Sequence, residues 1–147
     1  MEDFAADPSH PRYDSLLKRH LLESAAQKGM LAGSALIAHG RGEAYDYLIG
    51  EKTIETAMTA TKHVLYRLKM ANNPVISVNG NTTALAGEEL MKLASLLDCP
   101  IEVNIFYRTP ERMSVLLNHL EEVKQKFGLT VEILGASPDA RIPGLEG

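Results

Sequence analysis

Residues 101–134, IEVNIFYRTPERMSVLLNHLEEVKQKFGLTVEIL, contain two predicted strands on either side of a helical pattern. The strands are IEVNIFY (101–107) and LTVEIL (129–134). Between them, Thr109-Pro110-Glu111 is typical of a helix start, because proline is favoured at the first helical position. Apolar residues then recur at helical spacing until Gly128, which predicts the end of the helix.

The preceding segment, residues 74–97, shows the same alternation of strand and helix. PVISVNGN (74–81) predicts a strand followed by a polar turn, and residues 87–97 predict a helix with one apolar face. Strands joined in this order by short connections are expected to be parallel, with right-handed crossovers. Residues 74–135 therefore predict a three-stranded, Rossmann-like βαβαβ half.

The region before this unit is predicted to be helical, after an irregular N-terminus over residues 1–12. A first helix is expected to begin at Arg12 or Tyr13 and to run to about Lys28, because Gly29 is a good stop signal. Its predicted buried stripe consists of Leu17, Leu21 and Ala25.

Two further segments complete the predicted helical region. Within residues 31–50, a short apolar segment (35–38) runs into His39-Gly40-Arg41-Gly42, and a new helical turn then covers residues 43–49. Thr53 is expected to cap another helix that ends near Met70.

The predicted fold is α/β, with an N-terminal helical region packed on a Rossmann-like parallel sheet. Its expected divisions are an irregular N-terminus (1–12), the helical region (13–73), the βαβαβ half (74–135) and a loop tail (136–147).

Composition limits the class of protein. The 147 residues, 45% hydrophobic and 23% charged, suit one globular domain of the usual size. The net charge of −4 argues against general nucleic-acid binding. The N-terminus does not resemble a signal peptide, and no apolar run is long enough to span a bilayer. A single cysteine, Cys99, fits a reducing cytoplasm, and its place before a strand predicts burial.

The first predicted site follows the first strand, where parallel sheets bind ligands. Asn79-Gly80-Asn81-Thr82-Thr83 resembles a phosphate-binding turn. Gly80 would permit close approach, the following helix would present free N–H groups, and Thr82 and Thr83 would add hydroxyl donors. The alternative is an ordinary Asn-Gly turn without a ligand.

The second predicted site is His39-Gly40-Arg41-Gly42-Glu43, in which Arg41 could direct its guanidinium at a phosphate. Alternatively, Arg41 pairs with Glu43 or Asp46, and His39 is a structural histidine. Three other arginines could reach a ligand or remain solvated: Arg12, Arg19 and Arg108. No histidine spacing indicates a metal site. These residues alone indicate an α/β domain that binds a phosphorylated small molecule.

Five motifs together resemble the archaeal phosphopantothenate synthetases, also called 4-phosphopantoate–β-alanine ligases. The motifs are HPRYDSLLKR (10–19), LIAHGRGEAYDYLIGEKT (36–53), PVISVNGNTTAL (74–85), IEVNIFYRTPER (101–112) and DARIPGLE (139–146). They occur in order along nearly the whole chain.

The resemblance implies a homodimer that joins 4-phosphopantoate to β-alanine with ATP and releases AMP and pyrophosphate, in coenzyme A synthesis. It implies ATP contacts from Arg19 and Arg41. Such chemistry calls for guanidinium groups and Mg²⁺ to neutralise the triphosphate. The Asn79–Thr83 turn would hold a phosphate of either ATP or phosphopantoate, and His39 is a candidate base for the β-alanine amine.

Members of that family continue beyond the IPGLE motif (142–146) into further strands and helices with additional ATP contacts. We therefore expect this chain to be the front part of a larger enzyme. The alternative is a shortened relative, a non-catalytic module that binds a nucleotide or phosphate and dimerises.

Overall fold

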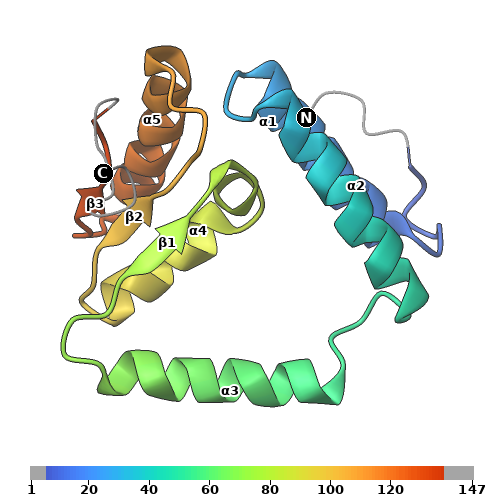
Figure 1. Cartoon of the computed structure of the whole chain (residues 1–147), viewed down its shortest axis with the longest axis horizontal. Coiled ribbons are helices and arrows are strands. Elements are labelled where there is room, and N and C mark those ends of the chain that lie inside the picture. The colour runs from blue at the N-terminus through green and yellow to red at the C-terminus, as the bar shows by residue number, and fades with distance from the viewer. Residues whose placement is uncertain (1–5, 138–147) are drawn as a thin grey trace.

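The computed structural model describes residues 6–137, so the predicted tail after Ser137 and the DARIPGLE motif lie outside the described residues. Helices and strands follow one another in the predicted order, as Figure 1 shows. The elements are α1 (Tyr13–Gln27), α2 (Gly33–Leu48), α3 (Glu55–Met70), β1 (Ile76–Val78), α4 (Gly80–Leu96), β2 (Ile101–Val103), α5 (Pro110–Phe127) and β3 (Ile133–Leu134).

The three strands form one parallel sheet in the order β1-β2-β3, which confirms the predicted α/β class. Ile76 pairs with Ile101, and Ile101 pairs with Ile133. Each strand is shorter than the predicted segment, because the chain leaves the sheet soon after the paired residues. The carboxyl ends of β1 and β2 therefore lie next to each other.

The boundaries of α5 follow the sequence signals. The Thr109 side chain accepts a hydrogen bond from the Arg112 backbone N–H at 3.3 Å, and Pro110 occupies the first helical position. At the other end, Gly128 has φ 62°, a left-handed conformation that glycine adopts without steric cost.

Helix α4 begins seven residues earlier than the predicted start at Gly87. Asn79 caps it, so the Asn-Gly sequence opens a helix and does not form a separate turn. Ala86 interrupts the helix with non-helical angles (φ −143°, ψ 16°). The sequence prediction found only the part after this kink, because its apolar periodicity starts there.

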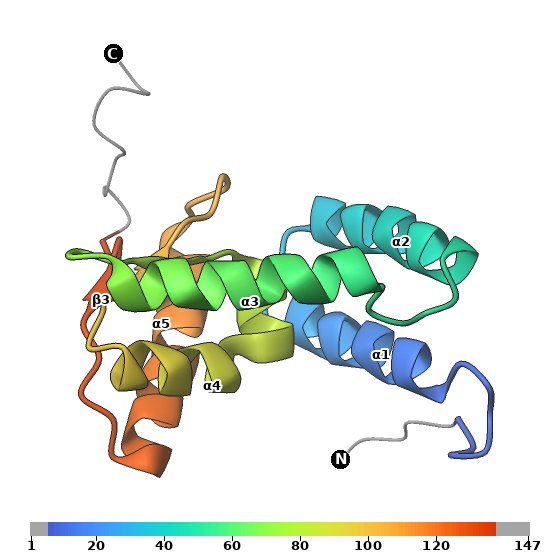
Figure 2. The same cartoon turned by 90° about the horizontal axis from the view of Figure 1, so that it is seen from below.

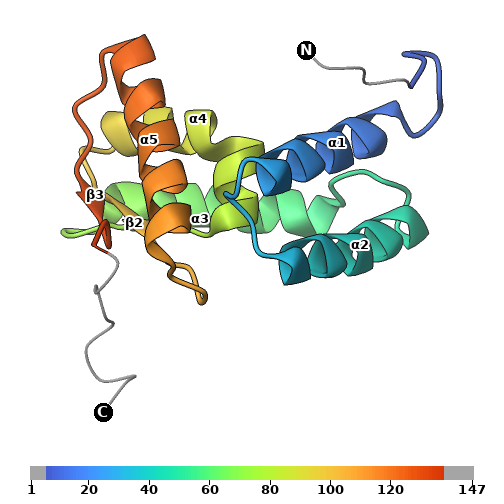
Figure 3. The same cartoon turned by 90° about the horizontal axis from the view of Figure 1, so that it is seen from above.

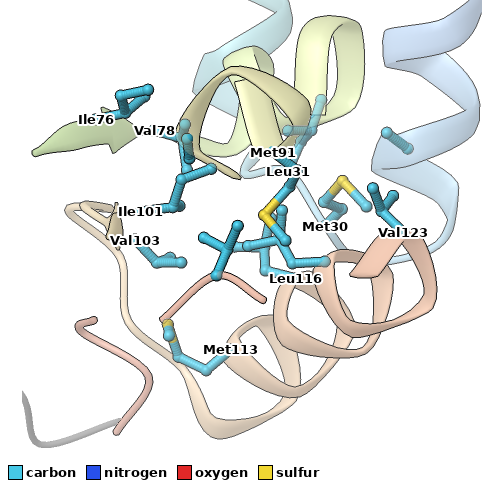
Figure 4. Close-up of a cluster of buried hydrophobic side chains, with 14 of the residues drawn as sticks. Met30, Leu31, Ile76, Val78, Met91, Ile101, Val103, Met113, Leu116 and Val123 are labelled. Carbon is cyan, nitrogen blue, oxygen red and sulfur yellow. The ribbon is translucent and has the colours of Figure 1, made fainter. Parts of the chain in front are cut away.

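Helices α4 and α5 pack side by side on one face of the sheet and enclose the core (Figures 1 and 3). Figure 4 shows the strand side chains meeting those of the two helices and of the connection between α1 and α2. Met91, Ile101 and Leu116 are fully buried there, and Met30 and Leu31 bring the α1–α2 connection into the same core.

Helix α1 packs on α4 and α2, but its buried side differs from the predicted stripe. Leu22 and Ala25 are buried, Leu17 is half-buried, and Leu21 is 42% exposed. The prediction of a buried Leu21 is wrong, and its neighbour Leu22 is buried instead. The reason is that two neighbouring helices, and not the sheet alone, determine which side of α1 is covered.

Helix α2 is one continuous helix of 16 residues, so the predicted break at His39-Gly40-Arg41-Gly42 is wrong. A Cβ added at Gly40 or Gly42 would meet no atom within 4 Å. Both glycines are thus accommodated in an ordinary helix, and Arg41 projects from a helical surface instead of a loop.

Helix α3 connects the outer end of α2 to β1 (Figures 1 and 2), and Figure 1 shows it apart from the core. The prediction that Thr53 caps it is wrong: Ile54 is the N-cap residue, and no side chain caps the helix. None of its residues is buried. Only α1 and α2 of the helical region pack closely on α4.

Within residues 6–137, no helix combines the length and apolar character needed to cross a membrane.

Candidate functional site

A cavity of about 510 Å³ opens beyond the carboxyl ends of β1 and β2. Four parts of the chain surround it: the α1–α2 connection with the start of α2, the start of α4, the loop after β2, and the first turn of α5. The lining residues are Met30, Leu31, Ala32, Ser34, Ala35, Ala38, Asn79, Gly80, Asn81, Asn104, Ile105, Phe106, Tyr107 and Arg112. This is the position at which open parallel sheets bind ligands.

Asn79 organises the first turn of α4 at the edge of this cavity. Its Oδ1 accepts hydrogen bonds from the Thr82 backbone N–H at 2.9 Å and from the Thr82 hydroxyl at 3.0 Å. The Thr83 hydroxyl donates to the Asn79 carbonyl at 2.8 Å. Both predicted hydroxyl donors therefore bond to Asn79, and Thr83 is buried. Neither threonine lines the cavity.

Gly80 and Asn81 hold α4 against the helical region. A Cβ at Gly80 would lie 2.7 Å from Leu31 Cδ2 and 3.2 Å from the Met30 carbonyl oxygen, so the close approach at this glycine is made by the chain itself. The Asn81 Nδ2 donates to the Ala35 carbonyl at 3.1 Å. These contacts place the N-terminus of α4, with its partial positive charge, at the cavity wall.

Arg41 is exposed on α2 and has no ion pair with any residue in the described range, although Glu43 and Asp46 are near it in sequence. Ser34, Ala38 and Arg41 follow the i, i+4, i+7 spacing of one helix face. Because Ser34 and Ala38 line the cavity, Arg41 lies one turn farther along the same face.

Arg19 lies on α1 and faces acidic groups. Its Nε is 3.2 Å from Glu23 Oε1, and its Nη1 is 3.7 Å from Glu43 Oε2. Its side chain is 56% exposed, so a stronger anion could compete for this guanidinium.

His39 does not line the large cavity. It borders a second cavity of about 250 Å³ between α1 and α2, together with Lys18, Glu43 and Asp46. Its Nε2 is buried and has no hydrogen-bond partner within residues 6–137. The structure thus separates His39 from the Asn79–Thr83 segment.

Arg12, at the start of α1, bonds to one carboxylate within α2 and to another just after that helix. Its Nε donates to Glu51 at 2.8 Å, and its Nη2 donates to Glu43 at 3.1 Å. The hydrogen bond from Arg12, together with a second from Ser15, lowers the pKa of Glu51. Two of the three nitrogens of this guanidinium thus bond to carboxylates, which ties the start of α1 to α2 and to the residues after it.

Arg108 is also structural. Its guanidinium donates to the carbonyl groups of Val103, Gly135 and Ser137, which fixes the chain after β2 to the chain after β3. Arg112, four residues later, instead lines the large cavity. Sequence reasoning missed Arg112; its signal was an arginine in the first turn of a helix that follows a strand end.

Cys99 is buried, as expected. Burial raises the pKa of its thiol, and the negative charge of Asp98 raises it further. Because the thiolate is the nucleophilic form, this cysteine lacks the character of a nucleophile.

The chain matches one family of known proteins. The family model described as phosphopantothenate/pantothenate synthetase matches residues 56–147. The 4-phosphopantoate–β-alanine ligase of Thermococcus onnurineus is 49% identical over 138 residues, which cover 94% of this chain and 51% of that protein. The ligase of the same name from Thermococcus kodakarensis gives the same identity and coverage.

A third relative, the 4-phosphopantoate–β-alanine ligase of Methanosarcina mazei, is 43% identical over 133 residues, covering 90% of this chain and 51% of the relative. The chain spans about half the length of the curated relatives it matches. With such identity along nearly its whole length, the chain belongs to the phosphopantothenate/pantothenate synthetase family.

Proposed function

We propose that this chain carries part of an ATP-dependent ligase that joins 4-phosphopantoate to β-alanine and yields 4′-phosphopantothenate, AMP and diphosphate, for coenzyme A synthesis. The observation that carries the proposal is its similarity to ligases of that name, at 43–49% identity over at least 90% of the chain. The cavity at the strand ends supports it, because its volume suits a small substrate.

The proposed reaction has two steps. The phosphopantoate carboxylate attacks the α-phosphorus of ATP, a new oxygen–phosphorus bond forms, and diphosphate leaves. The amine of β-alanine then attacks the acyl carbon, loses a proton and expels AMP. Both steps develop negative charge on phosphate oxygens, so they favour a site rich in guanidinium and backbone N–H donors.

Arg19 and Arg41 are the proposed ATP ligands. Arg41 supports this role because its guanidinium is exposed and without an ion pair in the described range. Arg19 supports it because its carboxylate partners are partly solvated and could be exchanged for phosphate. His39 is the proposed base for the amine proton, supported by its unpartnered Nε2.

Mg²⁺ is proposed only as the companion of the ATP phosphates. Within residues 6–137, no group of three or more His, Cys, Asp or Glu side chains could hold a metal ion. The ion usually keeps several waters and is held largely by phosphate oxygens, so it needs no protein cage. The described residues therefore define no separate magnesium site, and we assign the ion no step.

A second copy of the chain is the proposed partner, docked on α3. Met58, Thr61, Leu65 and Leu68 repeat at alternating three- and four-residue spacing, the pattern of a helix–helix seam. Met58 and Leu65 are 46% and 45% exposed. Two heptads separate Glu55 from Lys69 on one flank, so antiparallel pairing of two α3 helices would set these opposite charges against each other.

The proposed compartment is the cytoplasm, where a single unpaired cysteine is kept reduced.

A second candidate function is a non-catalytic module that binds a nucleotide or phosphate and dimerises. The observation that favours it is that His39, the proposed base, borders a different cavity from the one lined by Asn79, Gly80 and Asn81. A module of this kind would need only the large cavity and the exposed guanidinium of Arg41.

One experiment separates the two functions. The chain is incubated with ATP, Mg²⁺, 4-phosphopantoate and β-alanine, AMP and phosphopantothenate are quantified, and the Thermococcus onnurineus ligase serves as the positive control. The ligase predicts AMP that depends on both acceptor substrates. ATP binding by calorimetry without AMP release supports the module, and the absence of both contradicts both proposals.

A further inference from the structure

Arg112 is the only charged side chain among the described residues that line the large cavity. It occupies the third position of α5, and its backbone N–H donates a hydrogen bond to the side-chain oxygen of Thr109, the N-cap residue. Its Nη1 donates to the Tyr107 carbonyl at 2.6 Å, which holds the guanidinium at the loop after β2. The residue is half-buried, and this hydrogen bond keeps its guanidinium beside the loop.

The charge of Arg112 is not neutralised by any carboxylate in the described range. Arg12 bonds to two carboxylates. Arg108 also has no carboxylate partner in the described range and a buried, unpartnered Nε, but three backbone carbonyls at the sheet edge accept hydrogen bonds from its guanidinium. Arg112 has only the neutral Tyr107 carbonyl, and its Nε is buried without a partner in residues 6–137. Arg112 is half-buried, so its charge is only partly solvated and an anion in the cavity could pair with it.

The rest of the cavity also favours an anion. The N-terminus of α4 contributes a partial positive charge, and none of the described lining residues is acidic. The amides of Asn79 and Asn104 add polar groups beside the strand ends, and Met30 and Leu31 add apolar surface. The cavity thus combines polar and positively charged groups with apolar surface, which suits a phosphate ester with a carbon skeleton.

We propose that Arg112 binds the phosphate group of 4-phosphopantoate in this cavity and thereby selects the phosphorylated acid over pantoate. The assignment rests on the proposed ligase function and goes beyond it, because it decides which substrate occupies the strand ends. One guanidinium and one helix N-terminus match the charge of a single phosphate monoester. A triphosphate would need more cations than the described lining of this cavity supplies, and Arg19 and Arg41 lie on other helices.

The test measures binding of 4-phosphopantoate, pantoate and ATP to the chain by calorimetry. The variants are Arg112→Gln and Arg112→Lys, and the control is Arg67→Gln on the exposed surface of α3. Arg112→Gln should weaken 4-phosphopantoate binding about 10- to 100-fold, the usual worth of a charge-assisted contact. Pantoate and ATP binding should stay within about twofold, Arg112→Lys should retain part of the preference for phosphate, and Arg67→Gln should resemble the parent chain.

The outcomes are distinguishable. Unchanged 4-phosphopantoate binding in Arg112→Gln, equal losses for all three ligands, or a parent chain that does not prefer 4-phosphopantoate to pantoate overturns the assignment. Circular dichroism of each variant shows whether an equal loss comes from unfolding. If the parent chain forms no phosphopantothenate but Arg112→Gln still abolishes the preference for phosphate, the ligase proposal fails and the Arg112 assignment stands.

Discussion

Asn79 shows how one side chain determines the character of the site. Its Oδ1 caps α4 through the Thr82 N–H, and its own carbonyl accepts the Thr83 hydroxyl. The predicted phosphate-binding turn is therefore a capped helix N-terminus. What remains for a ligand is the backbone of Gly80 and Asn81, together with side chains brought from other elements.

Arg41 is the residue whose replacement tests the proposed ATP site most directly. Arg41→Ala should weaken ATP binding by about 1.5–3 kcal/mol, because it removes a charge-assisted contact to a phosphate. Since Arg41 is exposed and has no ion pair in the described range, the fold should not change. Calorimetry with ATP and Mg²⁺ measures the loss.

Arg67→Ala, on α3, is the matched control for Arg41→Ala and should bind ATP like the parent chain. Equal ATP affinity in Arg41→Ala and the parent chain would exclude Arg41 from the site.

At the scale of the element, the two helices α2 and α4 each contain a glycine, and adding a methyl group should have opposite effects on stability at these two positions. Gly40 lies in the interior of α2 with free space around it, so Gly40→Ala should stabilise the chain by about 0.5–1 kcal/mol. Gly80→Ala should destabilise it by about 1–3 kcal/mol, because the added Cβ would meet Leu31 and the Met30 carbonyl. Urea unfolding measures both effects. Shifts of the same sign would contradict this interpretation.

The α4–α5 contact includes a titratable group, His119, which lies half-buried against Gly87. Burial lowers its pKa from the usual 6.5; Glu122 acts in the opposite direction, and Lys28 adds a smaller lowering. Below pH 6.5, His119 is therefore protonated to a greater extent in the unfolded chain than in the folded chain. Stability should fall as the pH decreases through this range.

Unfolding midpoints in urea at about pH 7.5 and about pH 5.5 measure this dependence. His119→Gln removes the titrating ring, so its midpoint should fall less between the two pH values than that of the parent chain. The same fall in both proteins would assign the pH dependence to other groups.

At the scale of the whole molecule, α3 is the element that the rest of the described chain leaves uncovered. If two α3 helices pair, Leu65→Glu should convert a dimer into a monomer, because it puts a charge into the apolar seam. Tyr66→Glu is the control, since Tyr66 is 62% exposed on a different side of the helix. Light scattering coupled to size exclusion gives the mass of each. A dimer that survives Leu65→Glu places the interface elsewhere.

Much of the fold could be predicted because its signals are local. The Thr109 cap, the glycine after α5 and the apolar periodicity of α5 depend on residues within a few positions of one another. The break predicted at Gly40 and Gly42 was wrong, because glycine permits a turn but does not require one. The buried side of α1 depended on α2 and α4, which local periodicity does not contain.

The site was less predictable than the fold. The segment 79–83 was identified because it follows a strand, but the hydroxyls of Thr82 and Thr83 bond to Asn79. Arg108 and Arg112 look alike in sequence, yet one binds carbonyls at the sheet edge and the other lines the cavity.

By itself, the sequence determined the types and order of the elements and the family of the chain, because capping, periodicity and motifs are properties of neighbouring residues. Only the tertiary structure decided which side chains meet at the strand ends. Asn79, Asn104 and Arg112 come from three separate segments, and the parallel register of β1 and β2 brings them to one cavity. The tertiary structure also decided that His39 borders another cavity, because α2 continues as one helix through Gly40 and Gly42.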